Sequence, residues 1–495
     1  MQVVWVAAIL SFLSMAVGLA RDVLIVQRLG FSIHADIIVI VLLVPMLLEN
    51  IVGFVARDAA ASAFAKVERG VLADARGFAS GALILALIVA LGVAASFLFA
   101  SGGMLSALTP GWDQGSRDAA MNAFIMATSI VFFQTLVYFF VGYESVNSRF
   151  LVAASRPLLL GIAGVAALLL YDEETAALAY VVSQGAGLAC FVVFFWVVYW
   201  RSQALSISTF LRSVREVARI SSAFMIVPAS ILVIAFQQFP FLLERVAATA
   251  LGAGVPTLLS FVYRLVTVPQ SLFTASVLAV LAPILLRERE MGGGTDRASG
   301  GMFMSLAFGL LSMCSFIAFA GDLPFMLGLV GISTESTGAS FQGVVVAYAA
   351  GLPAFVLSGY LIKIGIIYGC ASRLLLPGLA AAIIQASLIV FVSARWGAPG
   401  IAVSSSIFFV LFCVFSMVSI RSRVAFCIPV SDSLRMVAAC LVAGVVMAMF
   451  PTSVSILGLV MKSATFVGVL AVAMVLVGAR GFLRSTYWRS VIAGG

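Results

Sequence analysis

The chain has 495 residues, of which 63% are hydrophobic and only 10% are charged, and its formal net charge is +8. Soluble domains are about 45–50% apolar and about 25% charged, so the composition excludes a water-soluble fold. Apolar runs of about 18 residues or more recur along the chain, and the short alternating segments of a membrane β-barrel are missing. The sequence therefore predicts an all-α, polytopic membrane protein.

About fourteen transmembrane helices are predicted from the apolar runs between charged, glycine or proline breaks. The first run begins at Val3 with no basic segment before it and no small-residue cleavage site after it, so we expect a retained helix and not a signal peptide. The predicted spans are 3–28, 33–55, 78–100, 120–146, 151–170, 176–200, 219–240, 256–286, 301–320, 342–366, 374–394, 398–420, 436–450 and 456–479.

Lysine and arginine are distributed as this number of spans requires. With the N-terminus in the cytoplasm, 21 of the 28 basic residues fall on the predicted inner loops and tail, six on the outer side, and Arg264 within a helix. This asymmetry follows the positive-inside rule and predicts that both termini are cytoplasmic. The net positive charge is then explained by binding of the inner loops to anionic lipid headgroups, and no nucleic-acid partner is expected.

Metal and cofactor sites are not expected. The six cysteines lie mostly inside apolar runs without paired spacing, which favours buried small side chains over a disulfide or metal framework. The single histidine, His34, could not hold a metal alone.

An internal repeat is indicated when the chain is shifted against itself by 217 residues. Segments 142–163 and 359–380 then align with nine identities in 22 positions, including Ala154-Ser155-Arg156 with Ala371-Ser372-Arg373. The alternative is chance identity among alanine, leucine and glycine. The repeat predicts two six-helix lobes of the same orientation, 1–200 and 217–421, joined by a cytoplasmic linker, 201–216. The remainder, 422–495, would hold two extra helices and a cytoplasmic tail.

Polar residues inside the predicted spans are candidates for a substrate site, because intramembrane charges are costly and usually face a watery cavity. Span 256–286 carries a polar stripe at helical spacing. Span 3–28 carries a second stripe that includes Arg21, and span 33–55 carries Asp36 and Glu49. The candidate substrate-binding residues are Arg21, Asp36, Glu49, Ser260, Arg264, Thr267 and Ser271.

The functional interpretation of these residues is a cationic, partly hydrated cavity between the lobes that attracts an anionic headgroup, since the planar guanidinium matches phosphate. The alternative for Arg21 and Arg28 is a position at the outer interface, with Asp22 or Asp36 neutralising one of them. Glu49 could titrate protons, pair with Arg264 or Arg21, or make a purely structural hydrogen bond.

Several motifs, in the same order along nearly the whole chain, resemble the MurJ/MviN family of lipid II flippases. They are Gly18-Leu-Ala-Arg21-Asp22, Leu29-Gly30, Ala35-Asp36, Pro45-Met-Leu-Leu, Thr109-Pro-Gly-Trp112, Asn147-Ser-Arg149-Phe150, Leu178-Ala-Tyr180, Tyr263-Arg264-Leu265 followed by Pro269, and Gly351-Leu-Pro-Ala-Phe355.

The resemblance implies a fourteen-helix, MATE-like fold of the MOP exporter superfamily. It also implies a flippase that moves an undecaprenyl-pyrophosphate-linked glycan through a cationic cavity, with the last two helices forming a groove for the lipid tail. Arg21, Asp36 and Arg264 match charged residues of the family. The expected partners are thus a lipid-linked oligosaccharide and membrane lipids, and no enzymatic activity is expected.

The chain also departs from the family pattern. A further family arginine falls at Met15, and the arginine of span 33–55 falls at Glu49, which reverses the charge. Span 374–394 carries Gln385 but no Asp or Asn, so the sodium ligands of some family members are not recognisable and the coupling ion stays open.

These departures leave several functions open. The substrate could be lipid II, or an exopolysaccharide or O-antigen repeat unit. A MATE-type drug antiporter would need more carboxylates deep in a lobe than Glu49, and a membrane glycosyltransferase or ligase would need richer outer loops. A degenerate homologue acting as a scaffold is the remaining alternative.

Overall fold

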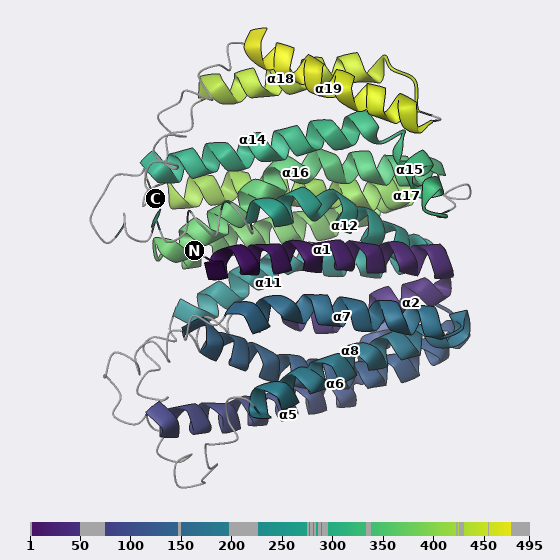
Figure 1. Cartoon of the computed structure of the whole chain (residues 1–495), viewed down its shortest axis with the longest axis vertical. Helices are drawn as coiled ribbons and strands as arrows, with labels where there is room; N and C mark the ends of the chain where they lie inside the picture. The colour runs from purple at the N-terminus through teal and green to yellow at the C-terminus, as the bar shows by residue number, and fades with distance from the viewer. Residues whose placement is uncertain are drawn as a thin grey trace. The chain divides into compact units, whose positions relative to one another are not determined.

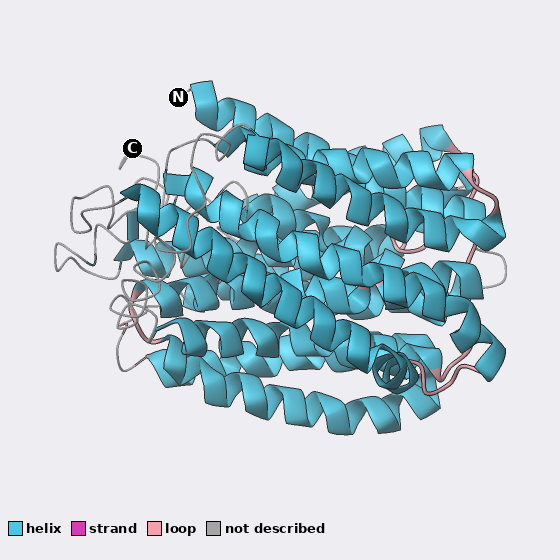
Figure 2. Cartoon of the chain, turned by 90° about the horizontal axis from the view of Figure 1, so that it is seen from below, coloured by secondary structure: helices cyan, strands magenta, loops and turns pink. Residues whose placement is uncertain are grey.

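The computed structural model describes residues 2–49, 75–146, 150–197, 226–274, 277, 281, 284–285, 289, 296–332, 338–421, 424, 430–453 and 455–476. These residues form helices joined by short loops and include no strand (Figure 2). The all-α prediction is therefore confirmed for the described part of the chain. The predicted linker 201–216 and the end of the predicted tail lie outside the described residues.

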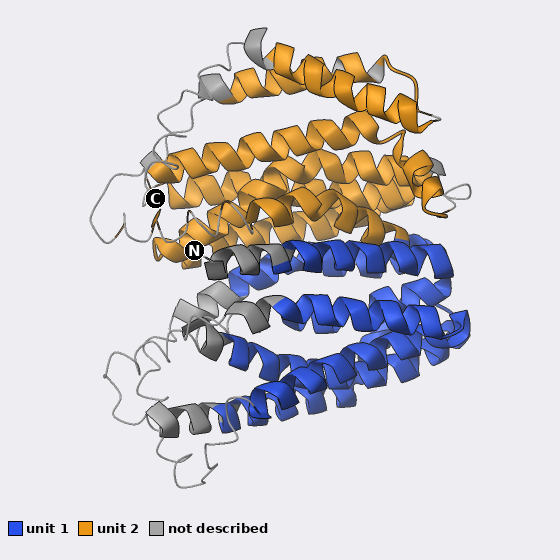
Figure 3. Cartoon of the chain, in the orientation of Figure 1, with its two compact units in different colours: residues 1–257 blue, residues 258–495 orange. Residues whose placement is uncertain are grey.

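The chain separates into two compact units, residues 1–257 and residues 258–495 (Figure 3). Their boundary falls in the first turn of α12 (Val255–Phe273). The predicted division into lobes 1–200 and 217–421 stays a prediction, and each unit is described by itself below.

Unit 1 is a bundle in which α7 packs along α1, α6 packs along α5, and α8 contacts both α6 and α7 (Figure 1). Its apolar core includes the stacked rings of Phe140 and Phe195, whose centroids lie 5.1 Å apart. The helices of unit 1 are α1 (Gln2–Leu29), α2 (Ile33–Val41), α3 (Leu43–Leu48), α5 (Ala75–Leu108), α6 (Gln114–Val146), α7 (Phe150–Leu170), α8 (Glu173–Phe195) and α11 (Ile226–Thr249).

The predicted span 33–55 is helical over Ile33–Leu48, with a local distortion at Leu42, where α2 ends and α3 begins. The N–H of Leu42 still donates to the carbonyl of Ile38 at 3.2 Å, and that of Met46 to the carbonyl of Leu42 at 2.9 Å. Because Pro45 has no N–H, the carbonyl of Val41 loses its normal helical donor at this point. Residues 50–55 are outside the described part.

Unit 2 contains the rest of α12, with α14 in contact with both α16 and α18. The tyrosine ring of Tyr263 on α12 packs edge-on against Tyr348 and Phe355 of α16, with centroid distances of 5.5 and 5.9 Å. The further helices are α14 (Asp296–Phe319), α15 (Leu323–Leu329), α16 (Gly338–Ile367), the short 3-10 helix η4 (Ala371–Leu374), α17 (Leu375–Ile420), α18 (Val430–Ala448) and α19 (Ile456–Leu476).

The long helix α17 is a helical hairpin. Its backbone leaves helical geometry at Gly397, where φ is 60° and ψ is −137°. The Nε2 of Gln385 donates to the Oγ of Ser405 at 2.9 Å, although a straight helix would separate the two residues by about 30 Å. This agrees with the two predicted spans 374–394 and 398–420, with glycine at the turn because a positive φ strains other residues.

Close contacts between glycine and serine bring helices together inside each unit. In unit 1, a Cβ added to Gly185 of α8 would lie 2.3 Å from the Oγ of Ser129 on α6. In unit 2, a Cβ added to Gly351 of α16 would lie 2.4 Å from the Oγ of Ser406 in the second arm of α17. Small residues at such contacts are common among membrane helices, and the internal repeat stays a prediction.

The last two helices are tied to the rest of unit 2 by a buried ion pair. The Nζ of Lys462 on α19 lies 2.7 Å from the Oδ2 of Asp322, which begins α15 and has no exposed surface. The same ammonium lies 5.9 Å from the ring centre of Phe319. Met436, Cys440 and other residues of α18 complete an apolar core with α14.

Seven helices among the described residues are long and apolar enough to cross a membrane, and three shorter apolar helices accompany them. Many of their large side chains are exposed, as for Phe99 (91%) and Leu170 (79%), which suits contact with lipid. The chain is a multi-pass membrane protein, and the total of fourteen spans stays a prediction.

Candidate functional site

Arg21 on α1 is paired with its neighbour in the sequence. Its Nε and a terminal nitrogen lie 3.1 and 2.9 Å from Oδ1 of Asp22, and the side chains are 16% and 12% exposed. The guanidinium also interacts with Tyr180 of α8, and the arginine Cδ lies 3.4 Å from where a Cβ of Gly164 on α7 would stand. Asp22 therefore neutralises Arg21 inside unit 1, as one of the sequence alternatives supposed.

Asp36 on α2 caps the start of α12. Its carboxylate accepts hydrogen bonds from the backbone N–H of Gly254 at 2.6 Å, and from the N–H and hydroxyl of Thr257 at 2.9 and 2.6 Å. The residue has no exposed surface. The first N–H groups of a helix lack intrahelical partners and carry partial positive charge, so a buried carboxylate there is well satisfied. Asp36 thus neutralises neither arginine of α1 and fixes the beginning of α12 instead.

Glu49, at the end of α3, belongs to a polar cluster inside unit 1. Its carboxylate accepts a hydrogen bond from the hydroxyl of Tyr138 at 2.5 Å and pairs with Arg156 of α7. The guanidinium carbon of Arg156 lies 4.7 Å from the centre of the Tyr138 ring. Gln134, one turn earlier on α6, contributes a further hydrogen bond to Glu49. Four residues from three helices therefore form one network.

The expected partner of Glu49 was wrong. Arg264 and Arg21 were the expected partners, but the structure pairs Glu49 with Arg156. Arg156, which was counted among the 21 basic residues of the inner side although it falls within the predicted span 151–170, lies in the second turn of α7 and is 7% exposed. Two features of the sequence could have indicated this cluster. Gln134 and Tyr138 are polar residues four positions apart in an apolar helix, and Arg156 belongs to the segment that aligns in the internal repeat.

The four remaining candidates form one face of α12. Ser260, Arg264 and Thr267 are half-buried and Ser271 is exposed, and the hydroxyl of Thr267 donates to the carbonyl of Arg264 at 3.2 Å. The opposite face is buried and apolar, with Leu258, Leu259, Val262 and Val266 each at most 2% exposed. The predicted polar stripe is thus present as a continuous face that carries one guanidinium and three hydroxyls.

Arg28 lies at the end of α1 and closes the end of α7. One of its terminal nitrogens donates to the carbonyl of Leu168 at 2.7 Å and lies 3.4 Å from that of Leu169. These carbonyls belong to the last turn of a helix, where acceptors lack partners and cations are favoured. The side chain is exposed, in keeping with the interfacial alternative given above.

The candidates therefore separate into distinct groups. Arg21, Asp36 and Glu49 each have their own partners within unit 1, whereas the residues of α12 lie together on one helix face in unit 2. Among the described residues, no group of three or more His, Cys, Asp or Glu residues is arranged to hold a metal ion.

A family model described as "Lipid II flippase MurJ" matches residues 25–477 of the chain. No curated protein sequence matches it.

Three solved structures illustrate the similarity of fold. A lipid II flippase MurJ in an inward closed conformation has a TM-score of 0.77 and 15% identity, with 95% of this chain and 98% of that chain covered. An inward-facing MATE family multidrug resistance transporter of the MOP superfamily has a TM-score of 0.62 and 14% identity, with 84% and 96% covered. A MOP superfamily transporter from Pyrococcus furiosus, whose binding pocket has reverse polarity, has a TM-score of 0.54 and 13% identity, with 84% and 93% covered.

Proposed function

We propose that this chain, which belongs to the lipid II flippase MurJ family, moves an undecaprenyl-pyrophosphate-linked glycan from the inner to the outer leaflet of the bacterial cytoplasmic membrane. Lipid II is the first candidate substrate, and alternating access is the proposed mode of transport. The observation that carries the proposal is the family match over residues 25–477. Members of this family are flippases. The proposed activity is therefore transport of a lipid across the membrane, without a covalent reaction.

The polar face of α12 is the proposed contact for the pyrophosphate. Arg264 can offer two parallel N–H donors to phosphate oxygens, a geometry that a lysine lacks. Ser260, Thr267 and Ser271 add hydroxyls along the same face, and these can donate to phosphate or to sugar oxygens.

Asp36 is proposed to act as a positioning residue. It holds Gly254 and Thr257 at the start of α12, and Arg264 follows seven residues later, about 10 Å along the helix axis. Displacement of the first turn would therefore move the guanidinium of Arg264. Arg21 is proposed to contribute an attenuated positive charge to substrate binding, because Asp22 already accepts two of its hydrogen bonds.

A second candidate substrate is another lipid-linked glycan, such as an exopolysaccharide or O-antigen repeat unit. The observation that favours it is the cluster around Glu49, where the resemblance implied an arginine. Since Glu49 is engaged by Arg156 and Tyr138, this position supplies no net positive charge for a pyrophosphate. A drug antiporter or a scaffold without transport activity would move neither lipid in the following experiment.

The test is transport by the purified chain in proteoliposomes. Lipid II and an undecaprenyl-pyrophosphate-linked oligosaccharide without peptide would be loaded in separate arms, and arrival in the opposite leaflet would be followed with a membrane-impermeant reagent. We expect transport by the wild type and transport reduced roughly 10–150-fold in Arg264→Ala, because the lost contact is worth about 1.5–3 kcal/mol.

The matched control is Arg395→Ala, since Arg395 is an exposed arginine outside α12. This variant should transport like the wild type. Normal flipping by Arg264→Ala, with both variants inserted to the same level, would contradict the role of the α12 face. Failure of the wild type with both lipids would contradict the flippase proposal itself.

A further inference from the structure

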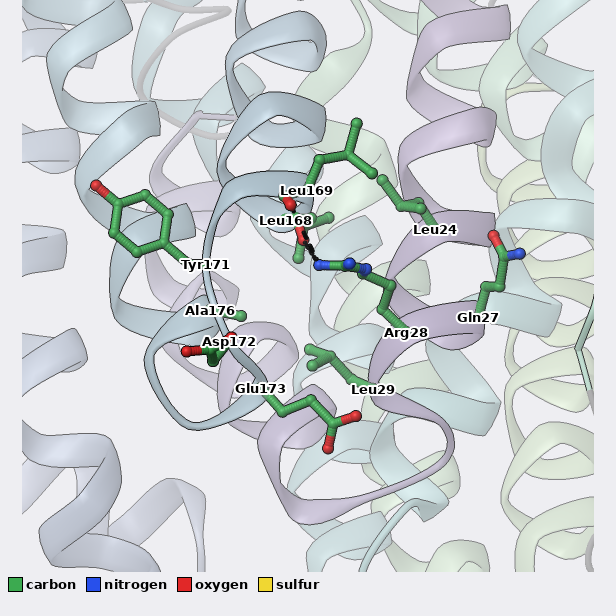
Figure 4. A pocket seen from close by; sticks show the side chains of 10 residues that line it. All are labelled: Leu24, Gln27, Arg28, Leu29, Leu168, Leu169, Tyr171, Asp172, Glu173 and Ala176. Atoms are coloured by element: carbon green, nitrogen blue, oxygen red, sulfur yellow. Dashed lines mark hydrogen bonds between the residues drawn. The ribbon is translucent and has the colours of Figure 1, made fainter.

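A pocket of about 540 Å³ lies in unit 1 where α1 and α7 end and α8 begins. Figure 4 shows the guanidinium of Arg28 directed at the end of α7, with Asp172 and Glu173 on the turn that leads into α8. The pocket therefore has one cationic and two anionic side chains on an otherwise mainly apolar wall. Its lining residues are Leu24, Gln27, Arg28, Leu29, Leu168, Leu169, Tyr171, Asp172, Glu173 and Ala176.

The charged groups of this pocket do not neutralise one another. Within the part of the chain that the structure describes, one terminal nitrogen of Arg28 donates to the carbonyls of Leu168 and Leu169. The Nε and the second terminal nitrogen can therefore donate to other acceptors. The side chain of Asp172 makes no capping hydrogen bond to α8, and neither it nor Glu173 forms an ion pair among the described residues. The cavity thus presents donors and acceptors at separate places.

The surroundings of the pocket have the composition expected at a membrane–water interface. Leu169, Leu170 and Tyr171 next to it are 53%, 79% and 51% exposed, so an apolar surface runs directly up to the charged turn. Tyrosine is enriched at the headgroup level of membrane proteins. The loop 171–172 joins two predicted spans on the outer side, where a lipid headgroup would meet the charges while its acyl chains follow α7.

We propose that this pocket binds the headgroup of a zwitterionic phospholipid with a primary ammonium group, of the phosphatidylethanolamine type. The phosphate accepts hydrogen bonds from Arg28, and the ammonium donates to the carboxylates of Asp172 and Glu173. Such a ligand satisfies both signs of charge at once. The site is separate in sequence from the polar face of α12 and does not depend on which glycan is transported.

The chemistry of the pocket predicts an order among lipids. A glycerol headgroup keeps the phosphate but has no cation for the two carboxylates. A choline headgroup has a cation, but its quaternary nitrogen carries no N–H and cannot donate to Glu173. Ethanolamine lipids should therefore bind more tightly than either.

The test is native mass spectrometry of the full chain in detergent, with ethanolamine, glycerol and choline phospholipids of identical acyl chains added at equal concentration. We expect preferential retention of the ethanolamine lipid. The double variant Asp172→Asn, Glu173→Gln should lower its apparent affinity about tenfold or more, since charge-assisted hydrogen bonds are lost. Because the variant removes two negative charges, the anionic glycerol lipid should be retained at least as strongly as by the wild type, and such retention shows that the variant remains folded.

The matched control is Glu174→Gln. Glu174 carries the adjacent carboxylate on the same helical turn, but it does not line the pocket. It should leave the ethanolamine preference intact. Equal retention of the three lipids, or an equal loss of preference in Glu174→Gln, would overturn the proposal. Competition by soluble glycerophosphoethanolamine as strong as by the lipid would overturn the lipid as the occupant.

Discussion

Replacement of Glu49 and Arg156 by methionine, singly and together, tests whether these residues form a structural pair. Methionine has a similar length and no charge, so each single variant removes one partner and leaves the other in place. In the wild type, Glu49 accepts hydrogen bonds from both Tyr138 and Arg156. The double variant removes both charges together and exchanges the pair for apolar contacts.

The expected cost differs between the two single variants because the partners differ in exposure. The side chain of Arg156 is 9% exposed and that of Glu49 is 29% exposed. Glu49→Met leaves a nearly buried cation without its carboxylate, which costs about 3–5 kcal/mol. Arg156→Met leaves a carboxylate that keeps the hydroxyl of Tyr138 and reaches solvent, so we expect about 1–3 kcal/mol. The double variant should lie within about 1 kcal/mol of the wild type, because hydrophobic replacement of a buried pair is often neutral.

The assay is the free energy of unfolding of the purified chain in mixed micelles, from titration with a denaturing detergent, combined as a double-mutant cycle. A coupling energy of several kcal/mol is expected. Costs that simply add in the double variant would show that Glu49 and Arg156 do not act as a pair. A larger cost for Arg156→Met than for Glu49→Met would refute the argument from exposure.

Three further outcomes follow from the structure. Asp36→Ala should lower the free energy of unfolding by about 2–3 kcal/mol and reduce transport, because the start of α12 loses its cap. Asp36→Asn should have smaller effects on stability and on transport, which the unfolding and flipping assays measure. Lys462→Met should cost about 3–5 kcal/mol in the unfolding assay, since it leaves the fully buried carboxylate of Asp322 without its cation. An unchanged free energy of unfolding would contradict the role of this ion pair in holding α19 to the rest of unit 2. In a cysteine-free background, an impermeant thiol reagent added to intact cells should label a cysteine at position Asp113 and not one at Arg215; the reverse pattern would overturn the predicted orientation.

The long apolar helices could be predicted from the sequence because length and hydropathy are enough to define a membrane span. The hairpin in α17 is an example, since Gly397 falls between two apolar runs and adopts a positive φ there. The local distortion at Leu42 was not predicted, although Pro45 was a signal for it. Hydropathy is the same on both sides of Leu42 and so did not reveal it.

The shared helix face of four candidate residues could be predicted from the sequence, whereas the partner of Glu49 could not. The spacing of Ser260, Arg264, Thr267 and Ser271 placed them on one helix face, because i and i+4 positions coincide on any α-helix. The pair of Glu49 with Arg156 joins residues 107 positions apart, and only the packing of α3, α6 and α7 brings them together. Spacing within a single helix carries no information about such contacts.

Several acidic residues in the described part of the chain share one physical role, which bears on how an anionic substrate could be attracted. Asp22 pairs with Arg21, Glu49 with Arg156, Glu244 with Arg245, and Asp322 with Lys462, while Asp36 accepts hydrogen bonds from the N–H groups at the start of α12. Each carboxylate thus offsets a positive charge or helix dipole inside its own unit, as the cost of burying a lone charge requires. The formal charges of Arg21, Arg156 and Lys462 are therefore largely balanced where they stand. Arg264, on the polar face of α12, is the proposed contact for the pyrophosphate, so its removal tests the proposed role of that face most directly.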